Sequence, residues 1–122
     1  SSSFNGVNEL ELRERHPVVV VLQVGEDIKS AGPSVLKFRL HLWNLIENDN
    51  ISVKLNNESI NDLKLIGPRQ TPLKGYWLEC LLNPSQAKIG ENTVQIIVNE
   101  RDKSIQTQLV LDAVQLHVHY DN

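Results

Sequence analysis

The stretch VLKFRLHLWNL, residues 35–45, alternates apolar and polar side chains with a period of two residues. Its apolar positions are Leu36, Phe38, Leu40 and Leu42, and its other positions are Lys37, Arg39, His41 and Trp43. Side chains two residues apart point to the same face of an extended chain. This stretch therefore predicts a β-strand with one face in the core and the other at the surface.

The same alternation recurs four more times along the chain, at residues 51–56, 76–82, 93–98 and 113–120. Each run has the length of an ordinary strand in a globular protein. Residues 18–24, VVVVLQV, have almost no polar face. Such a composition suits a strand that is covered on both sides, or one whose outer face another element shields.

Short turns separate these runs, and no long amphipathic segment lies between them. Asn56-Asn57 can adopt the positive φ angles of a tight hairpin. The only helical candidates are single turns at residues 27–31 and 85–89. We therefore predict an all-β protein, an antiparallel β-sandwich of seven to eight strands with one or two single-turn helices. Periodicity alone leaves immunoglobulin-like and jelly-roll topologies open.

Length and composition limit the domain organisation and the partners. A chain of 122 residues with 40% hydrophobic residues suits one compact domain, which we place at residues 18–122 after an N-terminal extension or linker at 1–17. The net charge of -3 lacks the positive field that binds phosphate backbones, so nucleic acid is not expected as a partner. The longest apolar run, residues 18–22, is far shorter than a membrane span, so no membrane association is expected.

The chain begins with three serines, contains no methionine and shows no secretory leader. We expect an excised module whose compartment was set by sequence outside it, and we favour an extracellular one. The single cysteine, Cys80, falls on a face predicted to be buried, where a thiol tends to be inert.

Several segments together resemble a known family. They are Val24–Ile28, Leu42–Leu45, Val53–Glu58, Trp77–Glu79, Ile89–Ile96 and Val110–Leu116. In their order and turn patterns they are similar to galactose-binding-domain-like β-sandwich modules, which are appended to glycoside-hydrolase-like proteins. The resemblance covers residues 18 to 120 and implies a jelly-roll sandwich that serves as an accessory domain. It also implies that the enzyme active site lies on another domain, while some members of the wider superfamily bind carbohydrate.

Aromatic side chains on the outer faces of strands are the candidates for ligand binding. An indole on a sheet surface can stack on the apolar face of a sugar while polar neighbours bind its hydroxyl groups. This pattern predicts a binding surface made of Trp43, Trp77, Arg39, His41 and Arg69. The alternative is that Trp43 lies under a loop or is covered by an adjoining domain.

Two sets of side chains are candidates for metal binding. His117 and His119 project to the same side of one strand, and His41 could supply a third nitrogen for zinc if the strands pair as in a jelly roll. The alternative is a solvated polar face whose histidines titrate near neutral pH.

The second set follows from the family resemblance. Galactose-binding-like folds often hold a structural calcium between the loop after an early strand and the start of the final strand. Glu26, Asp27 and Asp112 occupy comparable places in this chain. Alternatively, Asp27 caps a helical turn and Asp112 satisfies loop amides.

No motif in the sequence indicates catalysis. There is no Gly-x-Ser-x-Gly elbow and no pair of carboxylates suited to glycoside cleavage. The sequence therefore predicts a non-catalytic accessory module of a larger carbohydrate-active protein that binds glycan weakly. The alternative is a structural or interaction domain that packs against a neighbouring catalytic domain or mediates assembly.

Overall fold

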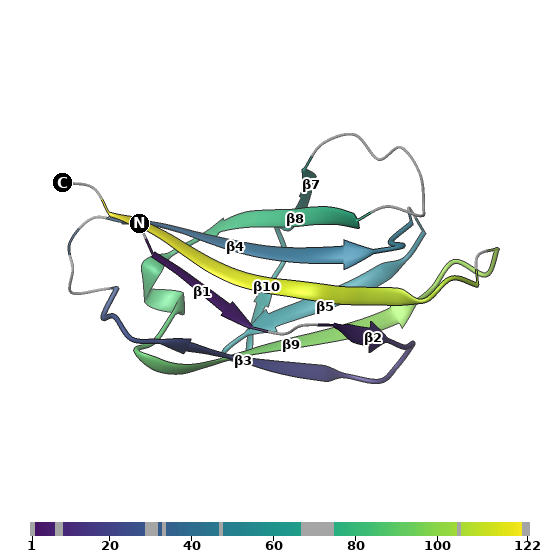
Figure 1. Ribbon diagram of the computed structural model, residues 1–122, viewed down its shortest axis with the longest axis horizontal. Helices are drawn as coiled ribbons and strands as arrows, with labels where there is room; N and C mark the ends of the chain where they lie inside the picture. The colour runs from purple at the N-terminus through teal and green to yellow at the C-terminus, as the bar shows by residue number, and fades with distance from the viewer. Residues whose placement is uncertain are drawn as a thin grey trace.

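The computed structural model describes residues 2–6, 9–28, 32, 34–46, 48–66, 75–104 and 106–120. In this part of the chain, ten β-strands and one short 3-10 helix form two antiparallel sheets that pack face to face (Figure 1). The predicted all-β antiparallel sandwich is confirmed. Among the described residues, no helix is long and apolar enough to span a membrane.

The larger sheet has six strands. Five of them follow the order β1-β10-β4-β8-β7, and the sixth, β2, pairs with residues 109–111 of β10. Its strands are β1 (Ser2–Gly6), β2 (Leu10–Leu12), β4 (Ser34–Trp43), β7 (Lys64–Ile66), β8 (Gly75–Leu82) and β10 (Leu109–Tyr120). The smaller sheet has the order β3-β9-β5-β6. Its strands are β3 (Val18–Val24), β5 (Asn50–Leu55), β6 (Glu58–Ile60) and β9 (Gly90–Glu100).

Two strands lie in the segment where the sequence predicted only an extension or linker. Both β1 and β2 fall within residues 1–17, and both pair with β10. The β1 sequence SSFNG has little strand propensity of its own, so its extended form depends on backbone hydrogen bonds to β10 rather than on apolar alternation. These two strands account for part of the difference between ten strands and the predicted seven to eight.

The core lies between the sheets and consists of the predicted apolar faces. The four inward side chains of β4, Leu36, Phe38, Leu40 and Leu42, are fully buried. They face Val94, Ile96 and Val98 of β9 and their neighbours on the smaller sheet. Tyr76 and Cys80 of β8 point inward as predicted.

The short connections follow the turn residues of the sequence. Asn56 and Asn57 have φ angles of 49° and 69°, which confirms the predicted hairpin turn. The 3-10 helix covers Pro84–Gln86, one residue earlier than the predicted turn at 85–89, because the Asn83 side chain caps it and Ala87 is already extended. Residues 29–31 of the other predicted helical turn lie outside the described residues.

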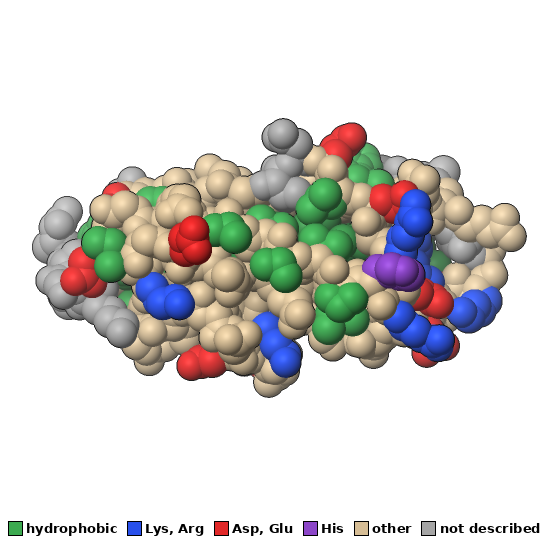
Figure 2. Space-filling view, turned by 90° about the horizontal axis from the view of Figure 1, so that it is seen from below, with side chains coloured by type: hydrophobic (Ala, Val, Ile, Leu, Met, Phe, Trp, Pro, Cys, Tyr) green, Lys and Arg blue, Asp and Glu red, His purple; other side chains and the backbone are tan. Residues whose placement is uncertain are grey.

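The outer face of β3 differs from the prediction of a shielded strand. Val19 and Val21 are 58% and 44% exposed, and within the described residues no element covers them. Figure 2 views the smaller sheet from this side and shows hydrophobic side chains interrupting the polar surface across its middle. Four consecutive valines indicated a doubly buried strand, but β3 is the edge strand of its sheet and buries only alternate residues.

Candidate functional site

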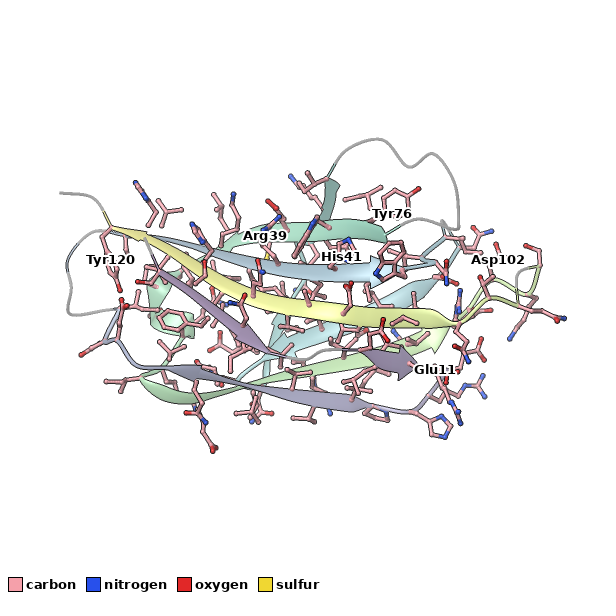
Figure 3. The ribbon with its side chains drawn as sticks, in the orientation of Figure 1. Glu11, Arg39, His41, Tyr76, Asp102 and Tyr120 are labelled. Carbon is pink, nitrogen blue, oxygen red and sulfur yellow. The ribbon has the colours of Figure 1, made fainter. Side chains whose placement is uncertain are left out.

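The outer face of the larger sheet brings together most of the predicted binding residues. In the pairing of β4 with β8, His41 lies opposite Trp77 and Trp43 lies opposite Gly75. Arg39 lies opposite Glu79 in the same register. The side chains of Arg39, His41, Trp43, Trp77 and Asp112 therefore form one continuous region, which we call the aromatic surface. Figure 3 labels two of its residues, Arg39 and His41.

Trp43 is the exposed ring of the aromatic surface, with 41% of the residue accessible to solvent. Its Nε1 donates a hydrogen bond of 2.7 Å to Oδ2 of Asp112. The other oxygen of Asp112 accepts from Nδ1 of His41 at 2.5 Å, because an ionised carboxylate can only accept. His41 also meets Trp43 edge to face, with ring centroids 5.5 Å apart. The exposed indole is thus held in a fixed orientation.

A glycine lets these rings lie close to the sheet. A Cβ atom placed on Gly75 would come within 2.4 Å of Cε1 of His41 and 3.1 Å of Cε2 of Trp43. Both contacts are shorter than normal van der Waals separations. The absence of a side chain at Gly75 therefore makes room for His41 and Trp43 on the β4–β8 surface.

A β-bulge aims Asp112 onto this surface. The register between β10 and β4 shifts between Leu111 and Ala113, so Asp112 is an extra residue in the strand. Such a bulge locally interrupts the alternation of faces and is frequent beside functional sites. Leu111 points into the core, while Asp112 reaches the outer face and bonds to both rings.

Trp77 is less available than Trp43 because Arg39 covers it. The guanidinium carbon of Arg39 lies 3.8 Å from the centroid of the Trp77 ring, a cation–π contact. Two hydrogen bonds fix the guanidinium there, from Nε to Glu79 at 2.7 Å and from Nη1 to Gln115 at 3.1 Å. The two predicted platforms thus differ in their surroundings, because Trp43 is exposed and one face of the Trp77 ring is covered by Arg39.

The predicted zinc ligands are not brought together. His41 lies opposite Ala113 of β10, whereas His117 lies opposite Lys37, four residues further along β4. At about 3.3 Å per residue these histidines are roughly 13 Å apart along the sheet. His117 instead contacts Ser3, with Nδ1 2.7 Å from the hydroxyl oxygen.

The predicted calcium ligands are separated as well. Asp112 lies near the start of β10, while Glu26 contacts Tyr120 at its end and accepts a 2.7 Å hydrogen bond from Ser2. These hydrogen bonds lower the pKa of Glu26, and the carboxylate raises the pKa of Tyr120 to about 12. Among the described residues, no three His, Cys, Asp or Glu side chains group closely enough to hold a metal. Arg69 lies outside the described residues.

The single cysteine, Cys80, lies on the buried face of β8. Burial raises the pKa of the Cys80 thiol to about 11, which agrees with the prediction of an inert thiol.

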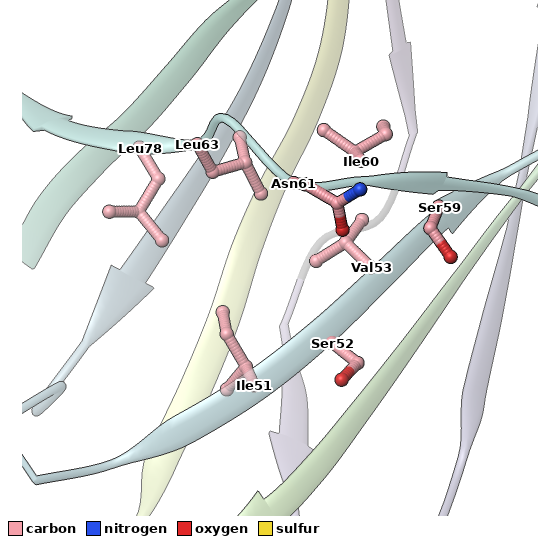
Figure 4. Close-up of a pocket in the computed structure, with 8 residues that line it drawn as sticks. All are labelled: Ile51, Ser52, Val53, Ser59, Ile60, Asn61, Leu63 and Leu78. Atoms are coloured by element: carbon pink, nitrogen blue, oxygen red, sulfur yellow. The ribbon is translucent and has the colours of Figure 1, made fainter.

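A cleft of about 270 Å³ opens where the chain crosses from β6 to β7 (Figure 4). Ile51, Val53, Ile60, Leu63 and Leu78 supply its apolar lining, and Ser52, Ser59 and Asn61 its polar one.

Fold and site together define a β-sandwich module with an aromatic surface. The chain is similar in structure to BuGH86, a family 86 glycoside hydrolase, in two crystal structures that contain neoagarooctaose, one of the wild type and one of a glutamate-to-glutamine variant. Each comparison has a TM-score of 0.67 and 12% sequence identity. Each covers 96% of this chain but 18% of the hydrolase, so this chain corresponds to a small part of that protein. No protein-family model matches the sequence, and neither does any curated protein.

Proposed function

We propose that this chain is a non-catalytic accessory module of a larger carbohydrate-active protein and that it binds glycan weakly through the aromatic surface. The observation that carries the proposal is the exposed, immobilised ring of Trp43, held by Asp112 and His41 above Gly75. A fixed indole loses little entropy when a sugar ring stacks on it. The similarity to a segment of a glycoside hydrolase, and the resemblance to galactose-binding-domain-like jelly-roll modules, support an accessory role.

The geometry also sets the strength of binding. One exposed ring on an open sheet buries a small area, and the neighbouring polar groups are largely engaged with each other. Small contact areas give modest affinities, because association first costs translational and rotational freedom. We expect dissociation constants on the order of 1 mM, equivalent to about 4 kcal/mol of binding free energy.

Affinity electrophoresis tests this proposal. The purified chain is run through native gels with and without a polysaccharide, beginning with agarose because the BuGH86 crystal structures are complexes with neoagarooctaose. Retention should be lost in Trp43→Ala and reduced less in Trp77→Ala, whose ring is covered by Arg39. Val21→Ala, on the other sheet, serves as the matched control and should migrate like the wild type. Equal retention of Trp43→Ala and the wild type on every retaining polysaccharide would remove the basis of the proposal.

A second candidate function is structural. Val19 and Val21 lie exposed on the face opposite the aromatic surface, and an apolar edge strand suits packing against a neighbouring domain or a second copy. Sedimentation equilibrium of the wild type and of Val21→Lys tests the assembly form of this proposal. A self-association that the lysine abolishes would support it, and a wild type that stays monomeric at millimolar concentration would exclude it.

A further inference from the structure

The basic side chains beside the aromatic surface share one carboxylate, that of Glu79. Oε2 of Glu79 accepts from Nε of Arg39 at 2.7 Å, and Oε1 lies 3.6 Å from Nζ of Lys37. The Glu79 side chain is 15% exposed, less than either partner, so it is held between the two cations. Because ion pairs in a partly desolvated position are screened less by salt than free surface charges, the single charge of Glu79 weakens the field of both cations, although it cancels only one of their two charges.

The charges that line the adjoining hollow cancel. A depression of about 410 Å³ between β7 and β8 is lined by two lysines, Lys37 and Lys64, and by two acids, Asp62 and Glu79. Its other lining residues are Ile66, Cys80 and Leu81. At the opposite end of the aromatic surface, Asp112 adds a further negative charge beside Trp43. The region around the indoles therefore carries no net positive charge that could attract a polyanion.

Resting on the glycan-binding function proposed above, we propose that Glu79 is a specificity-determining residue that restricts this surface to uncharged glycans. A sulfate or carboxylate group approaching Arg39 or Lys37 meets the Glu79 carboxylate at the same place, so Glu79 cancels part of the attraction. Asp62 and Asp112 nearby add to the repulsion. An uncharged hydroxyl group incurs no such repulsion and can bond to either the carboxylate or the guanidinium. Unfavourable contacts with the wrong ligand are a common source of specificity.

Substitution of Glu79 by glutamine gives a direct test, because glutamine keeps the shape and one acceptor oxygen but removes the charge. Agarose and carrageenan serve as probes, since both are linear galactans. They differ in sulfation and also in the configuration of the anhydrogalactose unit, so variants are compared within each gel. Retention of the wild type, Glu79→Gln and Glu58→Gln is compared in both gels at about 20 and 200 mM salt. Glu58, which is exposed on β6 of the other sheet, changes the net charge by the same amount.

We expect tighter binding only for Glu79→Gln, and only to carrageenan, the sulfated polymer. With Arg39 and Lys37 unpaired, Glu79→Gln should bind carrageenan on the order of 10-fold more tightly at low salt, and most of this gain should vanish at high salt. The gain is read as the ratio of carrageenan to agarose retention of the same variant, and Glu58→Gln should match the wild type in both gels.

Each other outcome is informative. If the wild type were retained on carrageenan as strongly as on agarose, or more strongly, the role of Glu79 would be refuted while glycan binding would stand. Unchanged weak binding of Glu79→Gln to carrageenan would refute it as well. A wild type that is retained on no polysaccharide would overturn the glycan-binding function, and a salt-sensitive gain in Glu79→Gln would then still demonstrate the exclusion of polyanions by Glu79.

Discussion

Replacement of Gly75 by alanine tests the architecture of the aromatic surface. The added Cβ would lie 2.4 Å from Cε1 and 2.7 Å from Nε2 of His41, and 3.1 Å from Cε2 of Trp43. Optimal carbon contacts are about 3.5–4.0 Å, so the imidazole must move by about 1 Å or more. Such a shift breaks the 2.5 Å contact between His41 and Asp112 and leaves Trp43 with one fixed partner fewer.

The cost of this change can be bounded with a matched control. Overpacking of this kind costs typically 1–3 kcal/mol of the free energy of unfolding. At Gly25 an added Cβ meets nothing within 4 Å, so Gly25→Ala should stabilise the fold by about 0.4–1 kcal/mol through the unfolded state. Because both substitutions restrict the unfolded chain alike, the difference between their stabilities isolates the native clash at Gly75, about 1–3 kcal/mol.

Urea unfolding, followed by circular dichroism, measures both variants, and retention in agarose gels measures the site. We expect Gly75→Ala to be the less stable variant and to lose retention as Trp43→Ala does, while Gly25→Ala keeps it. If the two alanine variants had equal stability and their indole NMR signals matched those of the wild type, His41 and Trp43 could not lie over Gly75.

Three further predictions test contacts elsewhere in the structure. Asn92 is fully buried and its amide bonds to Lys88, Gly90 and Asn56, so Asn92→Ala should lower the free energy of unfolding by about 2–4 kcal/mol in urea titrations. The hydrogen bond from Tyr120 lowers the pKa of Glu26, so the stability that this bond contributes is present above the ordinary pKa of 4.5 and is lost as pH falls. The urea midpoint of Tyr120→Phe should therefore fall less than that of the wild type between about pH 6 and pH 3. Arg101→Met should lower the free energy of unfolding by about 3 kcal/mol, because the fully buried Asp49 carboxylate loses its ion-pair partner. Removal of the exposed Lys103 should lower it by under about 1 kcal/mol. Equal losses of stability in thermal melts would contradict this difference.

The fold was predictable where alternation was strong. In β4, β8 and β9 the period-two pattern identified the buried face correctly, because burial of one face is what that pattern records. It failed for β1, whose single large apolar residue is Phe4 and which pairs with β10. It also failed for β3, because a run of valines does not distinguish a covered central strand from an exposed edge strand.

Alternation predicted which face of the sheet carries the candidate site, but not which of its residues bond to one another. Alternation placed Arg39, His41 and Trp43 on one side, and the structure confirms that placement. The calcium role expected for Asp112 came from the family resemblance, and alternation gave no sign that Asp112 bonds to His41 and Trp43. A signal for the bulge was present in the sequence, since the buried positions of β10 pass from odd numbers, at Leu111, to even numbers, at Val114. Periodicity read across the whole strand, and not from residue 113 onward, would have exposed that shift.

The unequal roles of the two indoles follow from register, which alternation does not fix. Arg39 lies opposite Glu79 and reaches diagonally over Trp77, a neighbour at the next outward position of β8. The cation–π contact is worth about 0.5–2 kcal/mol and is supported by the hydrogen bonds to Glu79 and Gln115. A ligand that binds at about 1 mM gains only about 4 kcal/mol, so uncovering Trp77 would consume much of its binding free energy. A sugar should therefore stack first on Trp43, and a second contact at Trp77 should require a longer glycan that bonds to Arg39 in place.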